Sequence, residues 1–139
     1  MIFLDTNVLS ALMIVQPETK VADWLNRQPR TSIWMTSVNV FEIRSGLATM
    51  PFGRRREQKL EAFERLLARV IEHRVADFDG ASAEKAAEVF AEGRKKGRPM
   101  ELRDAMIAGI VLANHATLAT RNVKHFEDIA KSVVNPWEG

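Results

Sequence analysis

Three acidic residues, Asp5, Glu42 and Asp104, each stand in an apolar setting in this 139-residue chain. Taken singly, such a residue has a purely structural explanation, as a helix N-cap, a surface carboxylate or a partner of a helix dipole. Three carboxylates held close together would repel one another unless a cation lay among them. If the fold gathers these residues, we therefore expect a cation site with oxygen ligands.

Magnesium and manganese suit such a site best. These ions bind a few carboxylates, keep water positions open for a substrate phosphate, polarise a phosphoryl oxygen and activate a water molecule. Zinc is disfavoured, because the chain has no cysteine and no histidine stands at ligand spacing near the three acids. The lack of cysteine also excludes disulfides and a thiol nucleophile, and it fits a reducing, cytoplasmic location.

A phosphatase with an aspartate nucleophile at the end of a strand is the nearest alternative from acid chemistry. In such an enzyme a second aspartate often follows two residues later and protonates the leaving group. This chain has Asn7 at that position. An uncharged amide has no acidic proton to give, so the phosphatase is disfavoured.

Short apolar strands alternate with helices along the chain, which predicts an α/β sandwich with a mainly parallel sheet. The predicted strands are residues 2–4, 33–35, 75–78, 117–119 and 133–134. Helices are predicted over 8–15, 18–27 and 102–113, after a cap at Thr36 or Ser37, along a stripe of Leu60, Phe63, Leu67 and Ile71, and after Asp79 with Ala83, Ala86, Ala87 and Phe90 inward. Ligands of a parallel sheet bind beyond the carboxyl ends of its strands, and all three acids adjoin that rim.

The length fits a single domain over residues 1–139, without internal repeats or a flexible linker. The apolar N-terminus is interrupted by Asp5 and Asn7 and has no basic region before it. Neither a signal peptide nor a membrane span is therefore expected.

The formal net charge of +2 averages over a locally basic middle of the chain. Arg94, Lys95, Lys96 and Arg98 lead directly into the predicted helix that carries Asp104. Such runs are often only solvated helix ends. The functional interpretation is that these side chains hold an RNA backbone beside the acids, so that binding weakens as salt rises.

Five short motifs occur in a characteristic order along the chain. They are FLDTN at 3–7, FEIRSG at 41–46, LRDAMIAGIVLANH at 102–115, LATRNVKHF at 118–126 and NPW at 135–137. Together they resemble PIN-domain ribonucleases, and their order and spacing are similar to those of VapC toxins of bacterial VapBC toxin–antitoxin pairs, closest to the FitB-like branch. The resemblance spans essentially the whole chain and implies a PIN-like three-layer α/β/α sandwich of about five strands.

The resemblance also implies an activity, a single-stranded RNA endonuclease that uses Mg²⁺ or Mn²⁺. Asp5 and Asp104 would be direct metal ligands, and Glu42 would bind metal or orient the attacking water. Asn7 resembles a supporting residue behind the first aspartate, and Thr120 resembles the hydroxyl residue of the site. Asn122 stands where many relatives have a further acid, which leaves the number of metal ions open.

Two partners follow from the same resemblance, a second copy of the chain and a small VapB-like antitoxin. The first helix carries more apolar surface than one buried face needs, through Leu9, Leu12, Met13 and Ile14. In relatives the antitoxin packs along this helix and inserts a basic side chain among the acids. Because Asn122 replaces an acid, a catalytically weak PIN-like module that only binds antitoxin or nucleic acid is the alternative function.

Overall fold

The computed structural model describes residues 1–14 and 16–138. Its strands are β1 (Ile2–Leu4), β2 (Ile33–Thr36), β3 (Val75–Ala76), β4 (Thr117–Ala119) and β5 (Val133–Val134). Its helices are α1 (Thr6–Met13), α2 (Thr19–Asn26), α3 (Ser37–Ala48), α4 (Arg54–Arg65), α5 (Gly80–Lys95) and α6 (Leu102–Ala113), with the 3-10 segments η1 (Arg30–Ser32) and η3 (Val123–Ser132) and the π-helical segment η2 (Leu66–Ile71).

The five strands form one parallel sheet in the order β3-β2-β1-β4-β5. This confirms the predicted α/β class. The central strand is β1, in which Phe3 pairs with Trp34 of β2 and with Leu118 of β4. The segments that follow β1, β2 and β4 therefore leave the sheet side by side at one rim, where a parallel sheet holds its ligands.

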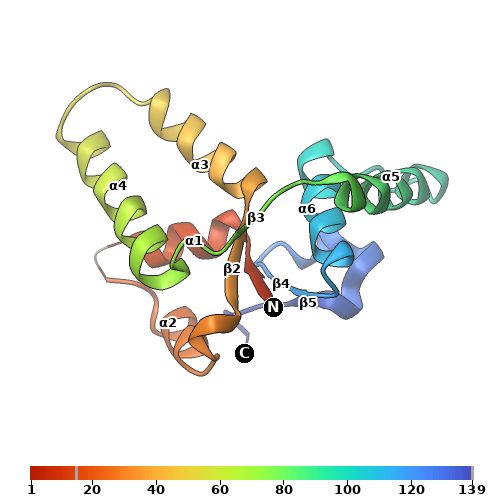
Figure 1. The fold of residues 1–139 in the computed structure, drawn as a ribbon, viewed down its shortest axis with the longest axis horizontal. Helices are drawn as coiled ribbons and strands as arrows, with labels where there is room; N and C mark the ends of the chain where they lie inside the picture. The colour runs from red at the N-terminus through yellow and green to blue at the C-terminus, as the bar shows by residue number, and fades with distance from the viewer. Residues whose placement is uncertain (15, 139) are drawn as a thin grey trace.

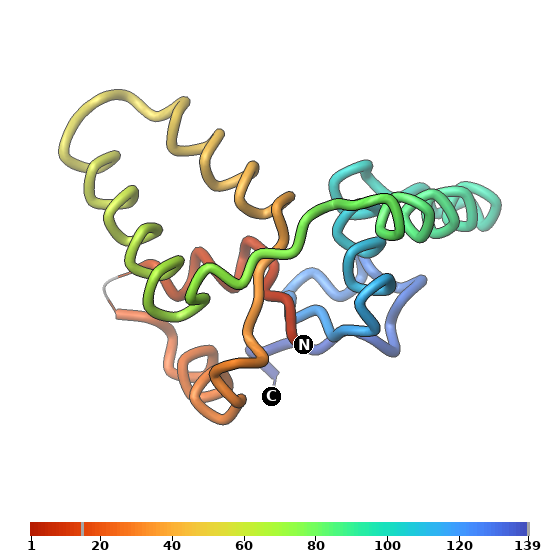
Figure 2. The backbone as a smooth tube through the Cα atoms, viewed as in Figure 1, coloured from red at the N-terminus to blue at the C-terminus, as the bar shows by residue number. Residues whose placement is uncertain are grey.

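Helices cover both faces of this sheet, with α1 to α4 on one face and α5 and α6 on the other (Figure 1). Successive residues of β1 point to opposite faces: Phe3 joins the core that contains Ile107, and Leu4 joins the core that contains Val8. Both are fully buried, as a strand covered on two sides requires. Figure 2 shows the backbone crossing between the two helical groups through β3.

The contact between α5 and α6 is close because small residues line it. Gly109 of α6 faces α5, where a Cβ atom at this position would lie 2.3 Å from the carbonyl oxygen of Ser82 and 2.7 Å from Cβ of Ala86. Backbone therefore packs almost directly on backbone. This packing sets the position of α6, whose first turn carries Asp104.

The predicted inward face of α5 was wrong at Ala83 and Ala87, which are exposed. Ala86 is buried as predicted, and Phe90 is half-buried. The buried residues of this helix are Ser82, Ala86, Val89 and Gly93. The alanines of α5 are spaced so that more than one face of the helix could be the buried one. The close approach of α6 decides which face is buried.

The stripe predicted along the fourth helix is interrupted where α4 becomes the π-helical η2. Phe63 and Ile71 are buried, but Leu66 takes the buried position expected for Leu67, which is half-buried. Leu60 is exposed. Leu66 follows Phe63 at α-helical spacing, and the wider π-helical turn then brings Ile71, five residues after Leu66, to the same face.

Several element ends also differ from their predictions, by one residue at the end of β2 and at each end of α2. Helix α1 begins at Thr6 rather than residue 8 and ends at Met13, and Val15, the predicted last residue, lies outside the described residues. Strand β3 ends at Ala76 rather than residue 78, because the N–H of Phe78 donates to Oγ of Ser37 at 3.1 Å. Among the described residues, no helix combines the length and the apolarity that crossing a bilayer demands.

Candidate metal centre

Asp5 follows β1 directly, and its side chain is buried in a set of hydrogen-bond donors. Its Oδ1 accepts from the backbone N–H of Thr6 at 2.8 Å and from Nδ2 of Asn39 at 3.3 Å. Its Oδ2 accepts from the hydroxyl of Thr120 at 2.9 Å. A carboxylate withdrawn from water needs such partners, so β1, α3 and β4 together fix this side chain.

Arg103 joins the three acids. Its guanidinium donates through Nη2 to Oδ1 of Asp5 at 2.8 Å and through Nη1 to Oδ1 of Asp104 at 2.6 Å. Its Nε lies 2.6 Å from Oε2 of Glu42. The structure therefore brings Asp5, Glu42 and Asp104 to one place at the rim of the sheet, around an arginine of the same chain.

Asp104 and Glu42 differ in their access to water. Asp104 is buried near the start of α6, and its Oδ2 lies 3.6 Å from Nδ1 of His125. The Glu42 side chain is 36% exposed and accepts a hydrogen bond from the hydroxyl of Thr6. The two aspartates thus form the floor of the centre, and Glu42 lies at its mouth.

Burial raises the pKa of Asp104, and its ion pair with Arg103 offsets that rise only in part. Burial by itself lowers the pKa of Arg103, but the carboxylates of Glu42 and Asp5 outweigh burial and raise this pKa above its ordinary value. Arg103 therefore stays charged, and it compensates the acids around it.

The three predicted supporting residues meet at the hydroxyl of Thr120. This buried hydroxyl donates to Asp5 and accepts from Nδ2 of Asn7 at 3.2 Å and from the backbone N–H of Asn122 at 3.1 Å. Asn7 also accepts from the backbone N–H of Arg121 at 3.0 Å. Asn122 thus takes part through its backbone, and its side chain is exposed.

Three residues of the centre, Thr6, Asn39 and Arg103, were missed in the sequence. Asn39 is fully buried in the first turn of α3, accepts from the hydroxyl of Thr36 at 2.6 Å and donates to the hydroxyl of Thr6 at 2.9 Å. It lies three residues before Glu42, hence on the same side of the helix. That spacing was the available signal for Asn39, as adjacency to Asp104 was for Arg103.

The four basic residues predicted to contact RNA divide into two pairs. Lys96 and Arg98 are held by Asp128, at 3.6 Å and 2.9 Å, and the Asp128 side chain is only 8% exposed. Arg94 and Lys95 are exposed on the last turn of α5, with Arg94 lying over the ring of Phe90. Lys96 and Arg98 therefore serve at least to anchor the α5–α6 connection on η3.

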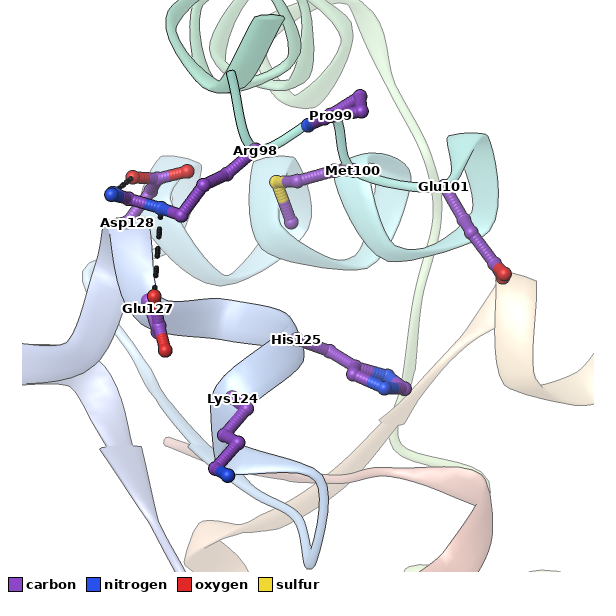
Figure 3. Close-up of a pocket in the computed structure, with 8 residues that line it drawn as sticks. All are labelled: Arg98, Pro99, Met100, Glu101, Lys124, His125, Glu127 and Asp128. Carbon is purple, nitrogen blue, oxygen red and sulfur yellow. Dashed lines mark hydrogen bonds and ion pairs between the residues drawn. The ribbon is translucent and has the colours of Figure 1, made fainter. Parts of the chain in front are cut away.

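A pocket of about 280 Å³ lies between this connection and η3. In Figure 3, Arg98 points toward Glu127 and Asp128, whereas His125 extends away from them. His125 lines the pocket and also approaches Asp104. The pocket therefore adjoins the acidic centre.

A second cavity, of about 480 Å³, opens on the other side of the centre, between α1, α3 and α4. Thr6 and Glu42 border it at one end, and Met13, Leu47 and Met50 line its apolar part. In the first helix Leu9 is fully buried and Ile14 is 52% exposed. The apolar surface that the sequence predicts in excess on this helix is therefore exposed at the C-terminal end of the helix.

The donor set of the centre fits a hard divalent cation. Three carboxylates already share one positive group, and hard ions prefer oxygen ligands. Within residues 1–14 and 16–138, however, no three acidic or histidine side chains are gathered as a closed metal site. The residue types suit the ion, but in the described part of the chain their side chains are spaced around a guanidinium and are not placed to hold a metal ion.

The PIN domain family model matches residues 2–132. The chain is 39% identical to the plasmid stability protein StbB of Pseudomonas syringae pv. tomato, and 33% identical to the VapC ribonuclease Y4jK of Sinorhizobium fredii, over 99% of both chains in each case. It is 28% identical to the toxin FitB of Neisseria gonorrhoeae, again over 99% of both.

Among solved structures, a FitAB complex bound to an IR36 DNA fragment matches with a TM-score of 0.87 and 29% identity, over 99% of this chain and 96% of the other. The parallel sheet and the acidic residues at its rim are consistent with these matches. The chain belongs to the PIN domain family.

Proposed function

We propose that this chain is a metal-dependent endoribonuclease that cleaves RNA phosphodiester bonds, and that it is the toxin of a toxin–antitoxin pair. The observation that carries the proposal is the convergence of Asp5, Glu42 and Asp104 on a single cation at the carboxyl rim of the sheet. Similarity to a VapC ribonuclease and to the toxin FitB supports the substrate class and the biological role.

Asp5 and Asp104 would hold the metal, Mg²⁺ or Mn²⁺, with Glu42 beside them. When bound, such an ion polarises the phosphoryl oxygen and lowers the pKa of a water molecule. Glu42, the most exposed of the three acids, would bind the ion or would orient the attacking water and accept its proton. Thr120 and Asn39 keep the Asp5 carboxylate in place, which avoids reorganising it during the reaction.

Four basic residues at the α5–α6 connection would contact the RNA backbone: Arg94, Lys95, Lys96 and Arg98. Arg94 and Lys95 are the stronger candidates, because the charges of the other two are already partly neutralised by Asp128. A phosphate contact of this kind contributes to affinity in a salt-dependent way.

The cavity between α1, α3 and α4 is our proposed seat for a VapB-like antitoxin. It combines apolar walls with direct access to Glu42, so a partner segment lying in it could reach the acids with a basic side chain. We further propose that the chain forms a homodimer, is located in the cytoplasm and folds as a single PIN-like domain over residues 1–139. A small neighbouring reading frame that encodes a DNA-binding antitoxin is expected.

The test is RNA cleavage by the purified chain, free of any partner. Mg²⁺ or Mn²⁺ should support cleavage and EDTA should stop it. Asp5→Asn should reduce the rate by at least about 10- to 100-fold, because loss of a direct ligand should cost no less than loss of an outer-sphere residue that supports it. Asp77→Asn is the matched control, because Asp77 also follows a strand, β3, but is exposed. Cleavage that survives EDTA or the Asp5 change contradicts the metal mechanism.

The alternative, a PIN-like module that binds antitoxin or nucleic acid without cutting, is favoured by one observation. Arg103 occupies the middle of the acids and pairs with each of them. Tight RNA or antitoxin binding without cleavage, at any Mg²⁺ or Mn²⁺ concentration, would establish this second function instead.

A further inference from the structure

The three acids of the centre share a pattern: each presents one oxygen to Arg103 and the other to a different group. Asp5 shares Oδ1 among Arg103, the backbone N–H of Thr6 and Nδ2 of Asn39, and gives Oδ2 to the hydroxyl of Thr120. Asp104 gives Oδ1 to Arg103, and its Oδ2 faces His125. The aspartate oxygens that a central cation would use are thus the ones that Arg103 contacts.

Glu42 completes the pattern, with Oε2 beside Arg103 and Oε1 bonded by the hydroxyl of Thr6. A small divalent ion bound by Asp5 and Asp104 needs oxygens within about 2.0–2.2 Å. Both of the aspartate Oδ1 atoms are now within 2.8 Å of guanidinium nitrogens. The ion and the guanidinium would therefore compete for the same oxygens, and two cations so close would also repel.

Two observations favour release of Arg103 from the centre. Its side chain is 28% exposed, so part of it already borders water. Its Nε is buried and close to Glu42, but the N–H is not aligned for a hydrogen bond. The contact keeps its charge attraction but lacks the alignment of a hydrogen bond, a directional requirement that a spherical ion does not have.

We propose that Arg103 is a resident counter-cation, which holds the acidic centre together without metal and is exchanged for the divalent ion when metal binds. This inference rests on the proposed metal-dependent function and deepens it: the chain carries its own inhibitory contact. The centre is preassembled in the Arg103-bound state. Metal must displace this side chain before the acids can act on RNA.

The first test is direct Mn²⁺ binding, followed through the electron paramagnetic resonance of free Mn²⁺, for wild type and Arg103→Met. Met keeps an aliphatic stem and removes the charge. The apparent dissociation constant of wild type is the intrinsic one divided by the fraction of time that the centre is free of Arg103, so occupancy by Arg103 above nine tenths predicts at least about tenfold tighter binding in the variant. Arg44→Met is the control, since it removes a guanidinium from an exposed pair between Arg44 of α3 and Glu64 of α4.

Equal or weaker Mn²⁺ affinity in Arg103→Met, with clear binding by wild type, overturns the inference and leaves the metal-dependent function intact. If neither protein binds Mn²⁺, both proposals fail. Tighter binding that disappears in Arg103→Met combined with Asp5→Asn places the ion at the centre. Thermal unfolding adds a readout: the variant should melt below wild type in EDTA and gain more from Mn²⁺.

A second test uses the wild-type chain and so does not depend on whether a variant folds. Nuclear magnetic resonance of ¹⁵N-labelled arginine guanidinium groups detects whether Arg103 is held. Its signals should show restricted rotation in EDTA and should shift and average on addition of Mg²⁺. Unchanged Arg103 signals at Mg²⁺ concentrations that saturate binding would contradict the exchange.

Discussion

Replacing Gly109 by alanine tests the packing that positions the helix of Asp104. A Cβ atom at this position would lie 2.3 Å from the carbonyl oxygen of Ser82, and 2.7 Å and 2.8 Å from Cβ and N of Ala86. Carbon–oxygen contacts are normally about 3.3–3.6 Å, so α5 and α6 must separate by roughly 1 Å. The obstacle is mostly backbone, which no side-chain rotation can relieve.

The expected magnitude follows from two opposed effects. Overpacking a tight contact typically costs about 1–3 kcal/mol, and a clash with backbone belongs at the upper end. Alanine regains about 1 kcal/mol of helix propensity over glycine. Gly109→Ala should therefore lower the free energy of unfolding by about 2 kcal/mol, equivalent to a fall in melting temperature of roughly 8 °C for a chain of this size.

Gly46→Ala is the matched control for that change. Gly46 is also a helical glycine, in α3, but no heavy atom outside its own helix and its chain neighbours lies within 4 Å of an added Cβ. Only the propensity gain remains, so this variant should be more stable by up to about 1 kcal/mol. Urea unfolding followed by tryptophan fluorescence measures both. The reasoning is refuted if Gly109→Ala is as stable as wild type, or if both variants change in the same direction.

Three further predictions concern the centre and its surroundings. Thr120→Val removes the hydroxyl that bonds Asp5, and should lower metal affinity or the cleavage rate about tenfold; unchanged values would show that the hydroxyl does not position Asp5. Because burial raises the pKa of Asp104 above 3.8, the metal-free folded state loses stability as pH rises from that value through the raised pKa. Asp104→Asn should therefore gain stability relative to wild type as pH rises above about 4 in urea titrations, and a pH-independent difference would contradict this. Lys95→Glu should weaken RNA binding and reduce the slope of log affinity against log salt, roughly by one unit for the lost contact, whereas an unchanged slope would remove Lys95 from the interface.

The order of strands and helices was predictable because hydrophobic spacing reports it locally. Short apolar runs followed by capping residues identified the strands and the helices after them, and the parallel sheet followed from their alternation. What hydropathy does not report is how closely two helices approach. Ser82 and Gly93, rather than the more apolar Ala83 and Ala87, face the core from α5, because only small groups fit against α6 and its flanks.

The candidate site, like the fold, was predictable from the sequence only in part. Its three acids could be selected from the sequence because a carboxylate in an apolar setting requires an explanation. Asn39 and Thr6 escaped notice because polar residues in the first turn of a helix are common and have ordinary roles as caps. Their part in the centre depends on hydrogen bonds that cross from α3 to the start of α1.

The amino-acid sequence by itself determined the order of the elements, the parallel sheet and the acidic residues at its rim, because these follow from local patterns and from the chirality of strand–helix–strand connections. Only the tertiary structure decided that Arg103 lies among the acids. Its neighbour Asp104 is one residue away, but Glu42 and Asp5 are distant in the chain, and a side chain can pair with all three only after the sheet and both helical layers have packed.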